Sequence, residues 1–285
     1  MHLRPTWSFQ SHGTLWRILL SDRRKILGEC RDEVKKETTF VCLDEQSGEI
    51  LWRHERPEDP WWIGLEAIHE NKVLLHGFET PDMPEHKRII ALDLDSGKEE
   101  WRNDEVTFWF AYESRIYAYR TMFERRAGRV LDLNTGEILE TLETIDEFIP
   151  LRQLARQGDV HESIDFPEAL SDAGVPGEVR QLVDRETGSR EIVGNIEAVV
   201  KDPFLVMNYH TPARGSRPEE PTLENRLAIL DFRRRERLFS ETLQTDARLP
   251  VPDSFFLKDA EVFFIKDRMN LSMLRLPLEN IGRTA

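Results

Sequence analysis

One segment recurs along the chain: a short apolar strand that ends near an aspartate, a tight turn that contains glycine, and a second strand. The clearest copies occupy residues 40–53, 89–102 and 129–139. In each copy, Ser-Gly or Thr-Gly supplies the residue with positive φ that a tight hairpin needs. The aspartate before it can accept hydrogen bonds from backbone N–H groups of the turn. A hairpin unit that repeats along a chain predicts an all-β repeat architecture.

Two weaker copies continue the repeat. Residues 182–188 keep the aspartate and the glycine, whereas residues 228–235 keep only the aspartate. Successive aspartates are 39 to 52 residues apart, which is the length of a four-stranded propeller blade with variable loops. The residues that define the repeat are Asp44, Gly48, Trp52, Asp93, Gly97, Trp101, Asp132, Gly136, Asp184, Gly188 and Asp231.

The copy from Ala91 to Trp101 has the pattern Ala-x-Asp-x-x-x-Gly-Lys-x-x-Trp. It resembles the quinoprotein-type (PQQ-like) repeat of β-propellers. The resemblance implies that the tryptophan locks neighbouring blades together, which is a structural role; the third copy has Glu140 in its place. Quinoprotein dehydrogenases hold a quinone and calcium, but they have longer chains and an export signal. We therefore expect no quinone and no other cofactor here.

The repeat predicts a single β-propeller domain over residues 1–285 with about six four-stranded blades. The last strand, over residues 271–276, has no successor in its blade, and residues 6–9 form a lone strand at the N-terminus. We expect these two strands to pair, so that the N-terminal strand closes the last blade. Such closure hides strand edges that otherwise invite aggregation.

Residues 150–180 break the rhythm of the repeat and are interpreted as a decorated blade. Ser163 or Asp165 is suited to begin a short helix, and Gly174 is suited to end it.

The two cysteines, Cys30 and Cys42, are too few for a disulfide framework. A hairpin centred on Lys36 would bring them opposite each other, and the alternative is two buried reduced thiols. The pattern favours two buried reduced thiols over a paired arrangement.

The charge of the chain restricts its partners. With 53 acidic and 39 basic residues, the formal net charge is −14, which argues against nonspecific binding to nucleic acid or anionic membranes. No apolar run approaches the ~18–20 residues of a membrane-spanning helix. The first residues lack the features of a secretory signal, so we expect a cytoplasmic protein with no membrane span.

Loops on a rigid scaffold are the usual place for binding residues. The long predicted loops cover residues 80–86 and 211–221, and the segment 57–62 between blades reaches the same face. We predict a ligand or partner site there, and Trp61, Trp62 and Trp109 have blade packing as an alternative role. The candidate binding residues are Trp61, Trp62, Asp82, His86, Trp109, His210 and Arg214.

Motifs of catalysis are absent from the sequence. The eight histidines are scattered without His-Glu-x-x-His spacing, and no nucleophile elbow or phosphate-binding loop occurs. His69 and His76 flank a hairpin and can share a side, but nothing in the pattern assigns a metal site or a catalytic residue. We therefore expect a noncatalytic propeller that binds a protein or a small molecule. The alternative is a small-molecule hydrolase or lyase with a metal at the mouth of the channel.

Overall fold

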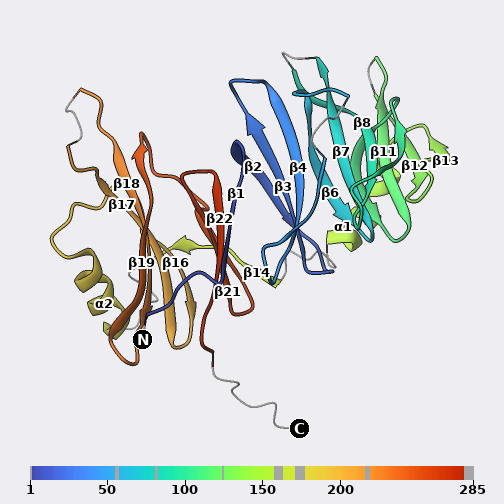
Figure 1. Ribbon diagram of the computed structural model, residues 1–285. Coiled ribbons are helices and arrows are strands. Elements are labelled where there is room, and N and C mark those ends of the chain that lie inside the picture. Colours follow the sequence, from blue (N-terminus) through green and yellow to red (C-terminus); the bar gives the residue numbers. More distant parts are fainter. Residues whose placement is uncertain are drawn as a thin grey trace, which may run out of the picture. The chain divides into compact units, whose positions relative to one another are not determined.

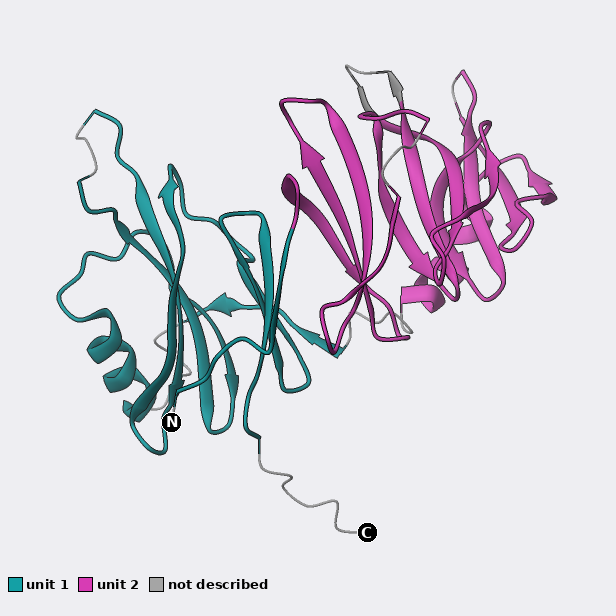
Figure 2. Cartoon of the chain, in the orientation of Figure 1, with its two compact units in different colours: residues 1–10, 163–285 teal, residues 11–162 magenta. Residues whose placement is uncertain are grey.

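The computed structural model describes residues 2–54, 58–80, 83–123, 125–156, 163–170, 177–215 and 219–278 (Figure 1). The chain is mostly β, and its strands lie in antiparallel sheets. It divides into two compact units, which are described separately (Figure 2). None of the helices in the described ranges is long and apolar enough to span a bilayer.

The unit of residues 11–162, the three-sheet unit, contains three four-stranded sheets. In each sheet the strands pair in chain order, as in a propeller blade. Sheet 1 consists of β2 (Thr14–Leu20), β3 (Lys25–Asp32), β4 (Glu37–Asp44) and β5 (Ile50–His54). Sheet 2 consists of β6 (Ile63–His69), β7 (Lys72–Thr80), β8 (Met83–Asp93) and β9 (Glu99–Asn103). Sheet 3 consists of β10 (Thr107–Tyr112), β11 (Arg115–Thr121), β12 (Arg126–Asp132) and β13 (Ile138–Leu142), and is followed by η1 (Asp146–Phe148) and α1 (Ile149–Arg156).

The recurring aspartates organise the turn between the third and fourth strands of these sheets. Asp44 Oδ1 accepts hydrogen bonds from the backbone N of Ser47 at 2.8 Å and from its hydroxyl at 2.9 Å. Gly48 then takes a φ of 71°, as the hairpin requires. Asp93 and Asp132 accept the equivalent backbone bonds in sheets 2 and 3, from the N atoms of Ser96 and Thr135.

The repeat tryptophans join one sheet to the next. Trp52 of sheet 1 donates its indole N–H to the carbonyl of Leu94 at 2.9 Å, and a Cβ on Gly97 would lie 2.5 Å from its ring. Trp101 of sheet 2 donates to the carbonyl of Leu133 of sheet 3 at 3.0 Å. Glu140, at the corresponding place in sheet 3, is exposed. Buried aliphatic side chains fill the spaces between sheets 1 and 2 and between sheets 2 and 3.

The unit of residues 1–10 and 163–285, the two-sheet unit, contains two five-stranded sheets. Sheet 4 consists of β15 (Glu168–Ala169), β16 (Glu197–Lys201), β17 (Phe204–Pro212), β18 (Leu223–Asp231) and β19 (Glu236–Ala247). Sheet 5 consists of β14 (Ile164–Asp165), β20 (Phe255–Lys258), β21 (Glu261–Lys266), β22 (Asn270–Arg275) and β1 (Trp7–Gln10). The predicted pairing of the two ends of the chain is confirmed, because β1 runs antiparallel to β22 with Trp7 opposite Met273.

The prediction of a repeat hairpin centred on Asp184 is wrong. Asp184 lies in α2 (Gly177–Thr187), and Gly188 ends that helix with a φ of 61°. The buried residues Val179, Leu182 and Val183 recur at helical spacing, and burial of this apolar face outweighs the likeness to a hairpin turn. The described residues form five sheets, so the predicted count of six blades is not confirmed.

The predicted helix between Ser163 and Gly174 is also wrong. Asp165 belongs to the short strand β14, which pairs with β20, and Gly174 lies outside the described residues. The α-helices among the described residues of this region begin at Ile149 and Gly177 instead. The copy at Asp231 is a true turn without glycine: its Oδ1 accepts from the backbone N of Arg234 at 2.8 Å, and Arg235 takes the positive φ.

The cysteines are not opposite each other. The hairpin of sheet 1 pairs Asp32 with Glu37, so Cys30 faces Thr39 and Cys42 faces Leu27. Both thiols are free and buried.

Candidate functional site

A bulge in the first strand of sheet 2 turns the side chain of Glu66 toward two histidines. The register of β6 against β7 shifts between Leu65 and Ala67, which leaves Glu66 without a partner residue in the ladder. The first strands of sheets 1 and 3 have shifts of the same kind, at Trp16 and Trp109. Bulges commonly re-aim a side chain next to a functional site.

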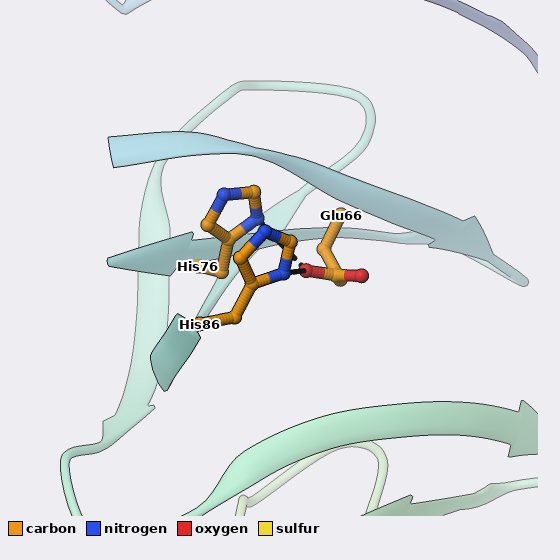
Figure 3. A group of neighbouring side chains, drawn as sticks. All are labelled: Glu66, His76 and His86. Atoms are coloured by element: carbon orange, nitrogen blue, oxygen red, sulfur yellow. Dashed lines mark hydrogen bonds and ion pairs between the residues drawn. The ribbon is translucent and has the colours of Figure 1, made fainter. Parts of the chain in front are cut away.

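Glu66, His76 and His86 form a close cluster that unites three neighbouring strands (Figure 3). The Nδ1 atoms of both histidines lie 2.8 Å from the same carboxylate oxygen, Glu66 Oε2. The imidazole rings are stacked, with centroids 3.6 Å apart and an interplanar angle of 7°. One ligand atom from each residue lies within 4.8 Å of the others, so the three side chains are a set that could hold a metal ion.

Two of the three side chains of the cluster are largely removed from water, and the third is more exposed. The side chain of His76 is 6% exposed, that of Glu66 is 15% exposed, and that of His86 is 36% exposed. Burial acts to raise the pKa of Glu66, but the two imidazoles outweigh it and lower that pKa to about 2. Burial lowers the pKa of His76, so its neutral form is favoured.

The two histidines differ in how their nitrogen atoms are satisfied. His86 Nδ1 donates a hydrogen bond to Glu66. His76 Nδ1 is equally close to the carboxylate, but it is buried and has no hydrogen-bond partner because the angle of approach is unsuitable. The electron pair or proton of this nitrogen is therefore available for another group.

The backbone of sheet 2 and a buried ion pair support the cluster. A Cβ at Gly64 would lie 2.8 Å from the His76 ring, so the ring rests on bare backbone. Glu29 of β3 accepts from the backbone N of Leu65 at 2.7 Å and from Arg31 Nε at 2.6 Å. Arg31 also donates to the carbonyl of Ile63 at 2.9 Å. These bonds attach the start of β6 to sheet 1.

An aromatic wall extends from the cluster. The Phe78 ring stands edge-on to His76 at 5.2 Å and to His86 at 5.7 Å. Trp62 packs against Phe78 at 5.9 Å, and Trp61 packs against Trp62 at 6.5 Å. The structure thus brings three of the predicted binding residues, Trp61, Trp62 and His86, into one continuous series of ring contacts.

The other predicted binding residues lie elsewhere. Trp109 is the bulge residue of β10, under the guanidinium of Arg152, which lies 5.0 Å from its ring. His210 is in the two-sheet unit, where it is buried and its Nε2 accepts from the backbone N of Val251 at 3.0 Å. Arg214 is exposed in a turn of the same unit, and Asp82 lies outside the described residues.

Trp109 borders a pocket of about 510 Å³ in the three-sheet unit. Residues of four elements and the turns after them line it: 20–22 at the end of β2 and beyond, 67–70 at the end of β6 and beyond, 108–113 in β10 and beyond, and 152 with 154–156 in α1. At its edge, His69 Nε2 makes a hydrogen bond with the carbonyl of Glu113 at 2.6 Å.

Sequence reasoning missed Glu66 and His76 as members of a site, and it missed the pocket. The sequence predicts a loop at His86, and this prediction is wrong, because His86 lies in β8 opposite Phe78 of β7. The alternation of His76 and Phe78 was the available signal, because residues two apart in a strand share a face.

Comparisons with known proteins find one family model and several distant solved structures. The family model of DUF4905, a domain of unknown function, matches residues 21–101, and no curated protein matches the chain. BamB from Moraxella catarrhalis is 9% identical, with a TM-score of 0.32 over 91% of this chain and 84% of that one. A europium-containing methanol dehydrogenase is 13% identical, with a TM-score of 0.34 over 88% of this chain and 56% of that one. The β-propeller domain of the Trilobed protease from Pyrococcus furiosus is 12% identical, with a TM-score of 0.33 over 91% and 64%.

Proposed function

We propose that this protein is a noncatalytic binding propeller that takes a small molecule into the pocket beside Trp109. The observation that carries the proposal is the pocket itself. Its volume of about 510 Å³ lies within the range of ~300–1,000 Å³ that is usual for small-molecule sites. It is built from the ends of first strands of several sheets and from one helix, so a rigid scaffold positions its lining.

The lining indicates the chemistry of the ligand. Apolar and aromatic side chains of β6 and β10 form much of the surface. Arg152 and Arg156 are four residues apart in α1 and therefore share a face of the helix. Acidic residues of the turns, Asp22, Glu70 and Glu113, also line the pocket. This combination suits a ligand with an apolar body and polar groups of both charges.

The test uses a panel of aromatic amino acids and dipeptides, which have this chemistry. We expect at least one of them to raise the melting temperature of the full chain and to change tryptophan fluorescence, because a ligand that binds only the folded state stabilises it. Arg152→Met should abolish the effect. Arg120→Met is the control, because Arg120 lies outside the pocket. Mass spectrometry should recover the ligand unchanged.

Two results would contradict the proposal. In one, no member of the panel binds. In the other, the ligand acts equally on the wild type and on Arg152→Met, or is converted into a product.

We also propose that the chain forms a single propeller whose last blade is completed by β1. The pairing of β1 with β22 supports this, because it joins the two ends of the chain within one sheet. Small-angle X-ray scattering of the full chain tests it: a closed ring predicts one compact particle, and two independently moving bodies would contradict it.

A further inference from the structure

We propose that Glu66, His76 and His86 form a site for one divalent transition-metal ion. The ligands would be two imidazole nitrogen atoms and one carboxylate oxygen. Neutral imidazole and carboxylate are common ligands of zinc and of related ions, and three protein ligands leave a position open for water or another molecule. The ligand atoms already lie within 4.8 Å of one another, whereas zinc needs each of them at about 2.0–2.2 Å from the metal. The three side chains are therefore close enough to reach one ion without movement of the strands that carry them.

The charge of Glu66 is the first argument for a cation. The carboxylate is mostly buried, and within the described ranges no lysine or arginine forms an ion pair with it; its partners there are the two histidines. Buried charges in proteins are normally paired with an opposite charge or coordinate a metal ion. A divalent ion would supply that charge.

His76 Nδ1 is the second, independent argument. This atom is buried and has no hydrogen-bond partner, although it lies 2.8 Å from Glu66 Oε2. Buried polar atoms are normally paired, so an unpaired nitrogen beside a carboxylate calls for a third group. A metal ion accepts the electron pair of His76 Nδ1 and that of the carboxylate together.

The stacking of the His76 and His86 rings shows that a side chain must move when a metal binds. The electron pair of an imidazole nitrogen lies in the plane of the ring, and the two planes are nearly parallel. One ring must therefore turn for both nitrogen atoms to bind the same ion. His76 is held against Gly64, whereas His86 is 36% exposed and lies where the register of β7 against β8 is irregular. We infer that His86 turns and that the stack opens when the metal binds.

The test uses the full chain, freed of metal with a chelator, and Co(II) and Zn(II) alone as probes. We expect one equivalent of Co(II) to bind with visible absorption bands and to be displaced by Zn(II). Glu66→Gln and His86→Ala should each weaken binding by more than the ~10–100-fold that loss of an outer-shell partner causes. His54→Ala is the control: it also removes a histidine, but one from β5 that is outside the cluster.

A second readout needs no variant and so does not depend on how a variant folds. Diethyl pyrocarbonate modifies exposed histidines of the wild-type protein, and peptide mass spectrometry locates the product. Zn(II) should protect His86 from modification and leave His54 unprotected. The proposal is overturned if no metal binds, if His86 is modified equally with and without zinc, or if folded Glu66→Gln and His86→Ala bind metal as the wild type does. The ligand panel and these metals address different residues, so either proposal can fail without the other.

Discussion

At the scale of single residues, three glycines allow aromatic rings to pack directly against the backbone. Gly97 and Gly136 lie under the indoles of Trp52 and Trp101, and Gly64 lies under His76. In the first two, the residue that permits the hairpin turn also permits the docking of a neighbouring sheet. The lack of a side chain at Gly97 and Gly136 thus permits both the hairpin turn and the packing of the neighbouring tryptophan.

Gly97→Ala should lower the free energy of unfolding by about 2–4 kcal/mol, because it combines a left-handed backbone with overpacking against Trp52. Gly188→Ala is the matched control: Gly188 also has positive φ, but a Cβ there would meet nothing within 4 Å. We expect about 1–2 kcal/mol for it. Urea unfolding measures both, and equal losses would contradict the role of ring contact.

The buried thiols should be unreactive in the folded protein. Burial raises the pKa of Cys30 and of Cys42 to about 12, so at pH 8 almost no thiolate forms. We expect iodoacetamide to label neither residue until denaturant is added. In the unfolded chain the thiols ionise near pH 9, so their contribution to stability is present below that pH and is lost as pH rises toward 12. Rapid labelling of the folded protein at pH 8 would refute this.

At the scale of elements, bulges in the first strands of sheets determine where certain side chains point. The N-terminal strand has a different role, because it covers the edge of a sheet. The register shift in β6 directs Glu66, and that in β10 directs Trp109. β1 covers the edge of β22, with Trp7 and Phe9 buried. An uncovered edge strand is a template for association.

Removal of residues 1–10 should therefore lower stability by at least about 3 kcal/mol, since the deletion removes two buried aromatic side chains. It should also cause association that increases with protein concentration, which analytical ultracentrifugation measures. Gln10→Ala is the control, because Gln10 is exposed on the same strand. A truncated chain that is monomeric and as stable as the wild type would contradict the role of β1.

At the scale of the whole molecule, sheets are joined by a small number of specific contacts as well as by apolar packing. In the three-sheet unit, tryptophans dock each sheet on the next, and the Glu29–Arg31 pair attaches β6 to sheet 1. Both side chains of the pair are almost fully buried. A buried charge whose partner is removed is strongly destabilising.

Glu29→Gln should cost about 3–5 kcal/mol, because it leaves the Arg31 guanidinium buried without its counter-charge. Glu105→Gln, which breaks an exposed pair with Arg120, should cost at most about 1 kcal/mol. Thermal unfolding compares the two, and similar losses would show that Glu29 has no special role in joining the sheets.

The range of the interactions explains how much of the fold and of the candidate site could be predicted from the sequence. The turns at Asp44, Asp93 and Asp132 depend on hydrogen bonds within a few residues, so their pattern is readable in the sequence. The segment at Asp184 has a similar sequence, but it belongs to α2. The burial of an apolar helical face decides this, and such burial depends on tertiary contacts. For the same reason, His86 could be named as a candidate while Glu66 and His76 could not be grouped with it.

The repeated hairpins, their glycine turns and the pairing of the two ends of the chain can be predicted from the sequence, since each depends on short-range chemistry or on an unpaired strand. Which side chains meet depends on the folded chain. The bulge at Glu66 and the register of three strands bring one carboxylate to two imidazoles, and the packing of α1 against β10 forms one side of the pocket beside Trp109. Register and packing depend on contacts between residues distant in the chain, and no local pattern encodes them.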